Sequence, residues 1–316
     1  MPATTTAAER LRVELAAQHA RFSPVYNGYL SDHGPMAALA LAGLGNDEDP
    51  IIDWLRDYRQ RLAPLSTAPP EYRRHLSMMQ EDVIRLGSES LLERELPALV
   101  SGWARHAYHP LIRTAYGYAF DVQEEVAAGL AYLGWLGADP AIAATAGRAR
   151  RASHADAPFR AMRACATQVT PGRRFDDCLT WVSTQTAFRE VPVVLDDPLE
   201  AYSRRGLAVF DATHDFFALH LVTGAHAFRV LYEFAGADRQ AVFALGMLAG
   251  YACVGAPDYP APDDQASAET PSAVDWLDLG RRDEHRIKIA YSAVSQSAWF
   301  SDPEYARIAF DYLSRS

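Results

Sequence analysis

Lysine is almost absent from this chain of 316 residues, because 29 of its 30 basic residues are arginine and only Lys288 remains. Acidic residues number 40, so the formal net charge is −10 at pH 7. Nucleic-acid binding depends on clustered positive charge, and this balance argues against such a partner. A GC-rich genome favours arginine codons and would explain much of the lysine deficit. What needs an explanation is the position of Lys288.

Cysteine is scarce as well, and the three present are widely spaced without a CxxC pair. Such spacing argues against a disulfide framework and against a thiolate zinc site. The first 20 residues contain no apolar signal core. The longest uncharged apolar stretch, Ala241–Ala256, is shorter than the roughly 18–20 residues that a membrane span needs. We expect a cytoplasmic protein without membrane contact, in which this stretch is a buried helix.

Several enzyme motifs are missing: the chain has no GxGxxG, GxxxxGK[ST], GxSxG or HExxH. Their absence argues against a Rossmann dinucleotide domain, a P-loop, an α/β-hydrolase nucleophile and a zincin site. A nicotinamide cofactor, NAD(P)H, or a flavin would therefore not be bound in a Rossmann domain, and an external supply of either as a reductant stays open.

Helical periodicity dominates what is present, and strict alternation of apolar and polar residues is rare. We predict one all-α domain over residues 1–316, in one or two lobes, with a peripheral N-terminal helix in residues 1–25. Residues 257–273, rich in Pro, Asp and Ala, predict an exposed loop, and Val191–Leu195 is the best strand candidate. The predicted helices are Ala7–Ala20, Pro35–Leu44, Pro50–Leu62, Pro70–Leu86, Leu91–Tyr108, Val122–Leu136 and Pro140–Arg151.

Lys288 follows His285 by three residues, so the two side chains share one face of a predicted helix. A lysine ammonium has no lone pair and cannot bind a metal. Burial lowers the pKa of a lysine, and the neutral amine can add carbon dioxide to form a carbamate with anionic oxygens. The simpler interpretation is a surface helix on which Lys288 pairs with Glu284, four residues before it.

Histidines in apolar or turn settings are the other candidates. His220 shares a helical face with Phe216 and Gly224, and it is either a core residue or a ligand in a dry cavity. His33 and His109 each lie close before a proline that opens a helix, so both project from rigid turns or are ordinary turn residues. We expect His226 to support a ligand or the fold, His214 to lie in a turn, and His19, His75, His106 and His154 to lie at the surface.

Together these segments resemble the questin-oxidase-like family of fungal and bacterial aromatic polyketide metabolism. The resemblance runs from about His33 to about Val294 and depends on the order and spacing of short motifs. These motifs are Asp32–Met36, His109–Ile112, Tyr116–Tyr118, Phe216–Thr223 and the pair His285 and Lys288.

The resemblance implies a non-haem iron(II) oxygenase that uses dioxygen on an aromatic substrate of the anthraquinone or hydroquinone type. The reaction would be ring cleavage or Baeyer–Villiger-type oxygen insertion. Lys288, as a carbamate, and Tyr116 are the expected catalytic residues. The expected iron ligands are His33, His109, His220, His285 and Lys288.

Many family members have a second histidine where this chain has Arg113, which makes that position a rival to His109. A zinc hydrolase with the same ligands and a non-catalytic helical binding protein are the alternatives. The substrate, mono- or dioxygenation and the oligomeric state stay open. The aromatic residues expected to line a flat pocket are Trp103, Tyr116, Tyr118, Phe216 and Phe217.

Overall fold

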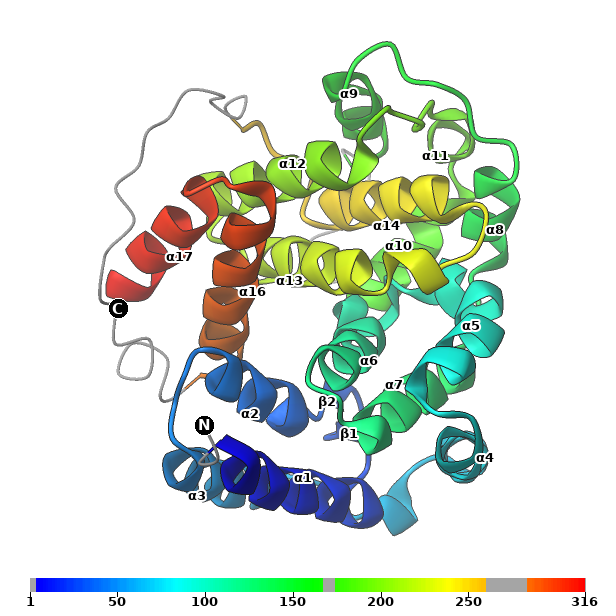
Figure 1. Cartoon of the computed structure of the whole chain (residues 1–316). Coiled ribbons are helices and arrows are strands. Elements are labelled where there is room, and N and C mark those ends of the chain that lie inside the picture. The colour runs from blue at the N-terminus through cyan, green and yellow to red at the C-terminus, as the bar shows by residue number, and fades with distance from the viewer. Residues whose placement is uncertain (1–3, 167–173, 260–282, 316) are drawn as a thin grey trace.

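The computed structural model describes residues 4–166, 174–259 and 283–315. In these ranges the chain forms 16 α-helices and one two-stranded sheet (Figure 1), which confirms the prediction of an all-α fold. The helices are α1 Thr4–Arg21, α2 Gly34–Gly43, α3 Glu48–Arg59, α4 Pro70–Leu86, α5 Ser88–Leu99, α6 His109–Ala119, α7 Gln123–Leu136, α8 Pro140–Ala146, α9 Asp156–Ala166, α10 Phe175–Thr184, α11 Thr186–Glu190, α12 Pro198–Thr213, α13 Phe216–Val230, α14 Arg239–Cys253, α16 Glu284–Phe300 and α17 Glu304–Ser314.

Proline marks the start of several helices, as the sequence indicates. It lies in the first turn of α2, α4, α6, α8 and α12, where its missing N–H costs no helical hydrogen bond. α4 has its predicted bounds, and α1, α2, α3 and α7 lie within three residues of theirs.

Three predictions around these helices are wrong. α5 ends at Leu99, not at Tyr108, and two short 3₁₀ turns follow it. A Cβ at Gly102 would lie 2.2 Å from the Gly137 carbonyl oxygen, so the chain leaves the helix where it packs against this backbone. α8 ends before Arg151, whose backbone pairs with Val194 in an isolated bridge. The predicted strand Val191–Leu195 is the third error: this bridge is its β pairing in the described residues, and it forms no strand.

The small sheet was not predicted. β1 (Val25–Tyr26) pairs with β2 (Leu30–Ser31) in antiparallel register, with Tyr26 opposite Leu30. Asn27 and Gly28 between them have φ angles of 50° and 84°, which is the conformation that an Asn-Gly turn adopts. The hairpin leads the chain into α2.

The core is built around α13 and α14, which lie side by side in the middle of the molecule (Figure 1). All residues from 241 to 252 in α14 are buried, so the predicted buried helix in Ala241–Ala256 is confirmed. By itself, no described helix combines the length and apolarity of a membrane span. α7 and α8, which meet at 96°, reach that threshold only as a bent pair and only by length and composition.

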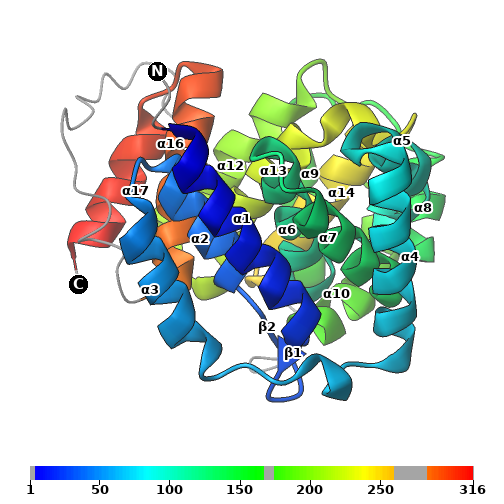
Figure 2. The same ribbon diagram turned by 60° about the horizontal axis from the view of Figure 1, so that its bottom comes forward.

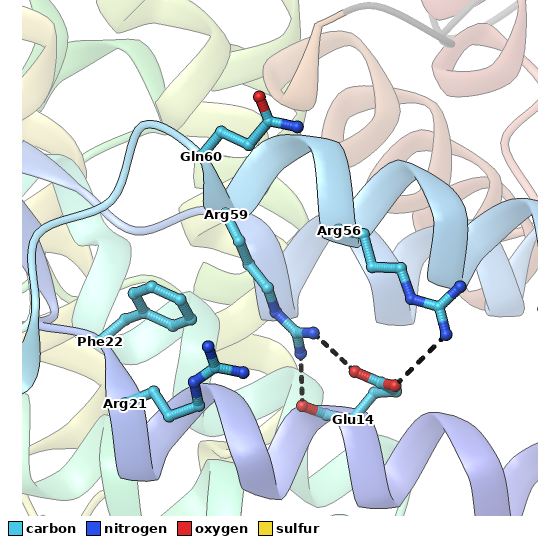
Figure 3. Close-up of a pocket in the computed structure, with 6 residues that line it drawn as sticks. All are labelled: Glu14, Arg21, Phe22, Arg56, Arg59 and Gln60. Atoms are coloured by element: carbon cyan, nitrogen blue, oxygen red, sulfur yellow. Dashed lines mark hydrogen bonds and ion pairs between the residues drawn. The ribbon is translucent and has the colours of Figure 1, made fainter.

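α1 crosses the outside of the bundle and packs against α3 and α7 (Figure 2). It lies at the edge of the fold as predicted, yet it buries Leu15, Gln18 and His19. Glu14 joins it to α3, because Arg59 Nη1 lies 2.6 Å from a Glu14 carboxylate oxygen and Arg59 Nη2 donates to the Glu14 carbonyl at 2.6 Å. These groups line a surface pocket of about 430 Å³ (Figure 3), where the ion pairs tie the two helices together.

The predicted loop at 257–273 lies almost entirely outside the described residues, which resume at 283. Cys178 and Cys253 form no disulfide.

Candidate metal centre

Four histidines from helices that lie far apart in the sequence meet in the interior of the fold. His33 directly precedes α2, His109 is the first residue of α6, and His220 and His285 lie within α13 and α16. The Nε2 atom of His109 lies 2.7 Å from His33 Nε2 and 3.1 Å from His220 Nε2. Ring centroids of His33 and His285 are 4.5 Å apart.

Three of these side chains form a group able to hold a metal ion. The ligand nitrogens of His33, His109 and His285 all lie within 4.8 Å of one another. The prediction that the chain has a metal site among its helices is thus supported at this level. His220 joins the cluster through its contact with His109.

Two of the histidines are oriented by backbone carbonyl groups. His109 Nδ1 donates to the carbonyl of His106 at 2.5 Å, and His220 Nδ1 donates to the carbonyl of Phe216 at 2.8 Å. A carbonyl only accepts, so each Nδ1 carries the ring proton, and each Nε2 of the neutral ring presents a lone pair.

Carboxylates orient the other two histidines. His33 Nδ1 lies 3.4 Å from Glu284 Oε1, and His285 Nδ1 lies 3.2 Å from Asp283 Oδ1. Glu284 Oε2 is in turn 3.4 Å from Arg61. The four Nδ1 atoms therefore bind outward acceptors, and the four Nε2 atoms are left for the interior. This arrangement is typical of histidines that bind a metal.

Burial keeps the histidines neutral. Removal from water lowers the pKa of His33, His109 and His220 well below 6.5, and the charge of the nearby Lys288 lowers it further. Neutral imidazole is the form that binds metals. Two facing Nε2 lone pairs at 2.7 Å repel each other, and a cation between them would remove that repulsion.

Lys288 lies one helical turn beyond His285 and is completely buried. Burial lowers its pKa to about 7, although the charges of Glu284 and Asp283 act in the opposite direction. Neither Lys288 Nζ nor His285 Nε2 has a hydrogen-bond partner in the described part of the chain. The alternative of a surface ion pair between Lys288 and Glu284 is therefore wrong, since Glu284 contacts His33 and Arg61 instead.

The turn before His109 has an unusual backbone. His106, Ala107 and Tyr108 have φ angles of 47°, 51° and 67°, so three consecutive residues other than glycine are left-handed. Each such residue costs about 1–2 kcal/mol. Tyr108 is held by a hydrogen bond from its hydroxyl to the Gly246 carbonyl at 2.9 Å. Gly224 gives the Tyr108 ring room, because a Cβ there would lie 2.8 Å from Cγ.

A cavity of about 500 Å³ borders His33, His109 and His285. The expectation that Phe216 and Phe217 line a pocket is confirmed, and their side chains are joined there by others that the sequence did not indicate. His106 is one of these; its side chain is partly buried, and a left-handed turn brings it to the cavity. Further lining residues are Tyr26, Tyr29, Phe175, Arg61, Arg174 and Asp176.

The other aromatic residues predicted for the pocket do not line this cavity. Trp103 is buried in the core and donates to the Val242 carbonyl at 3.1 Å. Tyr118 donates to Glu89 near the surface. Both occupy helix-spaced positions that suit a pocket wall as well as a core, so periodicity could not distinguish the two.

Tyr116 lies on α6, faces α16 and does not line the cavity. Its hydroxyl is 2.9 Å from Ser292 Oγ, which also lies 3.1 Å from His226 Nδ1. Ser292 follows Lys288 by one helical turn. Burial raises the pKa of Tyr116, so its hydroxyl keeps its proton. His226 supports this buried network, as expected.

Arg113, which stands at the rival ligand position, belongs to a different buried network. Its Nε donates to Glu125 Oε1 at 2.8 Å, and its Nη2 lies 2.9 Å from His19 Nδ1. His19 is 2 % exposed, so its predicted surface position is wrong. It is buried because the end of α1 packs over α6 and α7.

No protein-family model matches the sequence, and no curated protein matches it at a significant level. What this site can do follows from its own donor atoms and from the cavity beside them.

Proposed function

We propose that the protein is a questin-oxidase-like, non-haem iron(II) oxygenase that acts on an aromatic polyketide of the anthraquinone or hydroquinone type. The observation that carries this proposal is the meeting of His33, His109, His220 and His285 beside an aromatic cavity. With them lies the buried amine of Lys288, which has no hydrogen-bond partner among the described residues. The product would arise by ring cleavage or by insertion of an oxygen atom next to a carbonyl.

The donor atoms fit a metal ion. A buried polar atom without a partner costs about 1–3 kcal/mol, and neither His285 Nε2 nor Lys288 Nζ has a partner among the residues that the structure describes. With a pKa of about 7, Lys288 is partly neutral near pH 7 and can add carbon dioxide. His33, His109, His220, His285 and the carbamate of Lys288 would then hold iron(II), which imidazole and oxygen ligands suit.

Bound iron would supply the one-electron chemistry that dioxygen needs in order to react with a closed-shell aromatic molecule. The chain supplies the binding surface. Phe175 and Phe217, whose ring centroids are 5.2 Å apart, offer an apolar wall for a flat ring. Phe216 extends this wall to His285, with ring centroids 4.6 Å apart. In its carbamate form Lys288 would also accept a phenolic proton.

The ligand role of His220 can be tested against His226, because both are buried on α13. We expect purified wild-type protein to contain one iron per chain. His220→Ala should lower the iron affinity at least about 10-fold, whereas His226→Ala should retain it. Metal analysis and metal titration measure both quantities. Wild-type protein without stoichiometric metal, or equal losses in the two variants, would contradict the site.

The reaction class is tested with labelled dioxygen. We expect the iron-loaded protein to consume dioxygen in the presence of a hydroquinone or anthraquinone and to transfer ¹⁸O from ¹⁸O₂ into the product. Lys288→Ala should abolish this consumption. Product oxygen derived from water would instead indicate a hydrolase.

A further inference from the structure

His109 occupies the centre of the histidine cluster, since its Nε2 contacts the Nε2 atoms of both His33 and His220. Its Nδ1 donates a hydrogen bond to the His106 carbonyl, which orients the ring. That carbonyl belongs to the left-handed turn of residues 106–108. Whatever fixes this turn therefore fixes the central histidine.

Asp176, near the start of α10, binds this turn directly. Its Oδ1 accepts the backbone N–H of His106 at 2.7 Å, and its Oδ2 lies 3.2 Å from His106 Nε2. One carboxylate thus binds both the backbone and the side chain of one left-handed residue. An aspartate at this place holds a conformation that histidine avoids by itself.

The other ring nitrogen of His106 is also occupied. Its Nδ1 lies 2.8 Å from the Tyr132 hydroxyl, which is 2.9 Å from Ser31 Oγ at the end of β2. His106 borders the cavity, yet both of its ring nitrogens are bound by the protein. Its contacts therefore suit a role in holding the turn, not a role in proton transfer with a substrate.

We propose that Asp176 is a positioning residue: through His106 it holds His109 as the Nδ1–H tautomer, with the Nε2 lone pair toward the other histidines. The value of this tautomer for metal binding rests on the proposed function. The tautomer itself does not, and it can be observed without metal.

Asp177 provides a matched control for Asp176. Both carboxylates lie in the first turn of α10 and border the same cavity, so removing either changes the same charge near the same helix end. Contacts to His106 are found for Asp176 among the described residues. Asp176→Ala therefore removes the contacts to His106, whereas Asp177→Ala keeps them.

The first experiment observes the tautomer in metal-free protein by ¹⁵N–¹H NMR of labelled histidine, with His109→Gln assigning the signal. We expect His109 to be the Nδ1–H tautomer in the wild type and in Asp177→Ala. In Asp176→Ala it should become a mixture of tautomers. Wild-type protein with the proton on Nε2, or an unchanged signal in Asp176→Ala, would overturn the proposal.

The second experiment titrates cobalt(II) and follows its visible absorption. Asp176→Ala should bind cobalt about 10–100-fold more weakly and with an altered spectrum, while Asp177→Ala stays within about 2-fold of wild type. Equal affinity and spectrum in the wild type and Asp176→Ala would refute the link to metal binding. If the wild type binds no cobalt but its tautomer responds to Asp176→Ala, the proposed function fails and the positioning role stands.

Should Asp176→Ala fail to fold, Asp176→Asn keeps the side-chain volume and an acceptor for the His106 N–H while losing the negative charge beside the ring. We expect smaller changes in the same direction for both tautomer and cobalt affinity. An Asp176→Asn protein identical to wild type in both measurements would overturn the proposal.

Discussion

Lys288 is the residue whose environment differs most from its usual one. Lysine side chains are almost never fully buried without a partner, and this one has no hydrogen bond within the described residues. Its folded pKa of about 7 lies well below its value of 10.5 in water. Between pH 7 and 10.5, Lys288 is therefore mostly a neutral amine in the folded chain and an ammonium in the unfolded chain.

This difference predicts a pH-dependent stability of the metal-free protein in carbonate-free buffer. Between pH 7 and 10.5 the unfolded chain binds a proton that the folded chain does not, so the free energy of unfolding rises with pH. The slope attributable to Lys288 is about 1.4 kcal/mol per pH unit. The contribution is complete above pH 10.5 and lost as pH falls to about 7. Urea unfolding at several pH values measures it.

Lys288→Met is the control, because it keeps a long side chain and removes the titrating group. The wild-type minus Lys288→Met difference isolates this lysine from tyrosines that titrate at high pH. Parallel profiles of the two proteins would mean that Lys288 is solvated in the folded chain.

The burial of Lys288 could not be read from the sequence. Lys288, Ser292 and Gln296 form a polar stripe along α16, and such a stripe normally marks the solvent side of a helix. All three are buried here. Composition pointed to Lys288 because it is the sole lysine, but its surroundings come from helices far away in the sequence.

At the scale of elements, two glycines on α14 leave the space into which aromatic side chains from the segment before α6 pack. A Cβ at Gly250 would lie 2.0 Å from the Tyr108 hydroxyl oxygen, and a Cβ at Gly246 would lie 2.1 Å from Trp103 Nε1. Both aromatic side chains are fully buried and hydrogen-bonded, so neither can swing aside.

We expect Gly250→Ala to destabilise the fold by about 1–3 kcal/mol or more, since the added methyl overlaps Tyr108 in a packed core. Gly147→Ala is the comparison. Gly147 has a φ of −63°, and its Cβ would meet only the Ala143 carbonyl oxygen at 3.7 Å. That variant should be neutral or more stable by about 0.4–1 kcal/mol. Urea midpoints of the two variants test the pair, and similar losses would contradict the close approach.

Helix positions were predictable from the sequence where the local signals agreed. Proline at the start and apolar spacing along the helix place α4 correctly, and the apolar composition of α14 reveals its burial. The turn at 106–108 was not predictable, because no glycine marks it. Its left-handed residues are held by contacts to Asp176, Tyr132 and Gly246, which lie far from the turn in the sequence.

At the scale of the molecule, the proposed metal site joins helices α2, α6, α13 and α16. An ion bound there would link the N-terminal and C-terminal parts of the chain. His33 and Glu284, which are already in contact, are separated by 251 positions. The sequence could supply the candidates in order, but not their meeting, because each pairing depends on the whole topology.

Metal should therefore stabilise the whole fold. At a free metal concentration of 100 times the Kd, we expect about 2.7 kcal/mol of added unfolding free energy relative to chelator-treated protein. His109→Ala should reduce this gain strongly, whereas His226→Ala should keep it. Urea unfolding with metal and with chelator measures the difference. A gain that is equal in wild type and His109→Ala would place the metal elsewhere.

The positions of the proposed ligands in the sequence also determine when each one is synthesised. His33 and Lys288 are 255 positions apart (288 − 33), so a ribosome adding about 5–20 residues per second needs on the order of 10–50 s between them. During that interval His33 is already part of the chain, while His285 and Lys288 have not yet been synthesised. With the proposed ligand set, an ion would be fully coordinated only once nearly every helix has been synthesised, and a chain terminated before α16 would lack His285 and Lys288. A chain that contains the metal would thus be one that has been translated at least as far as α16.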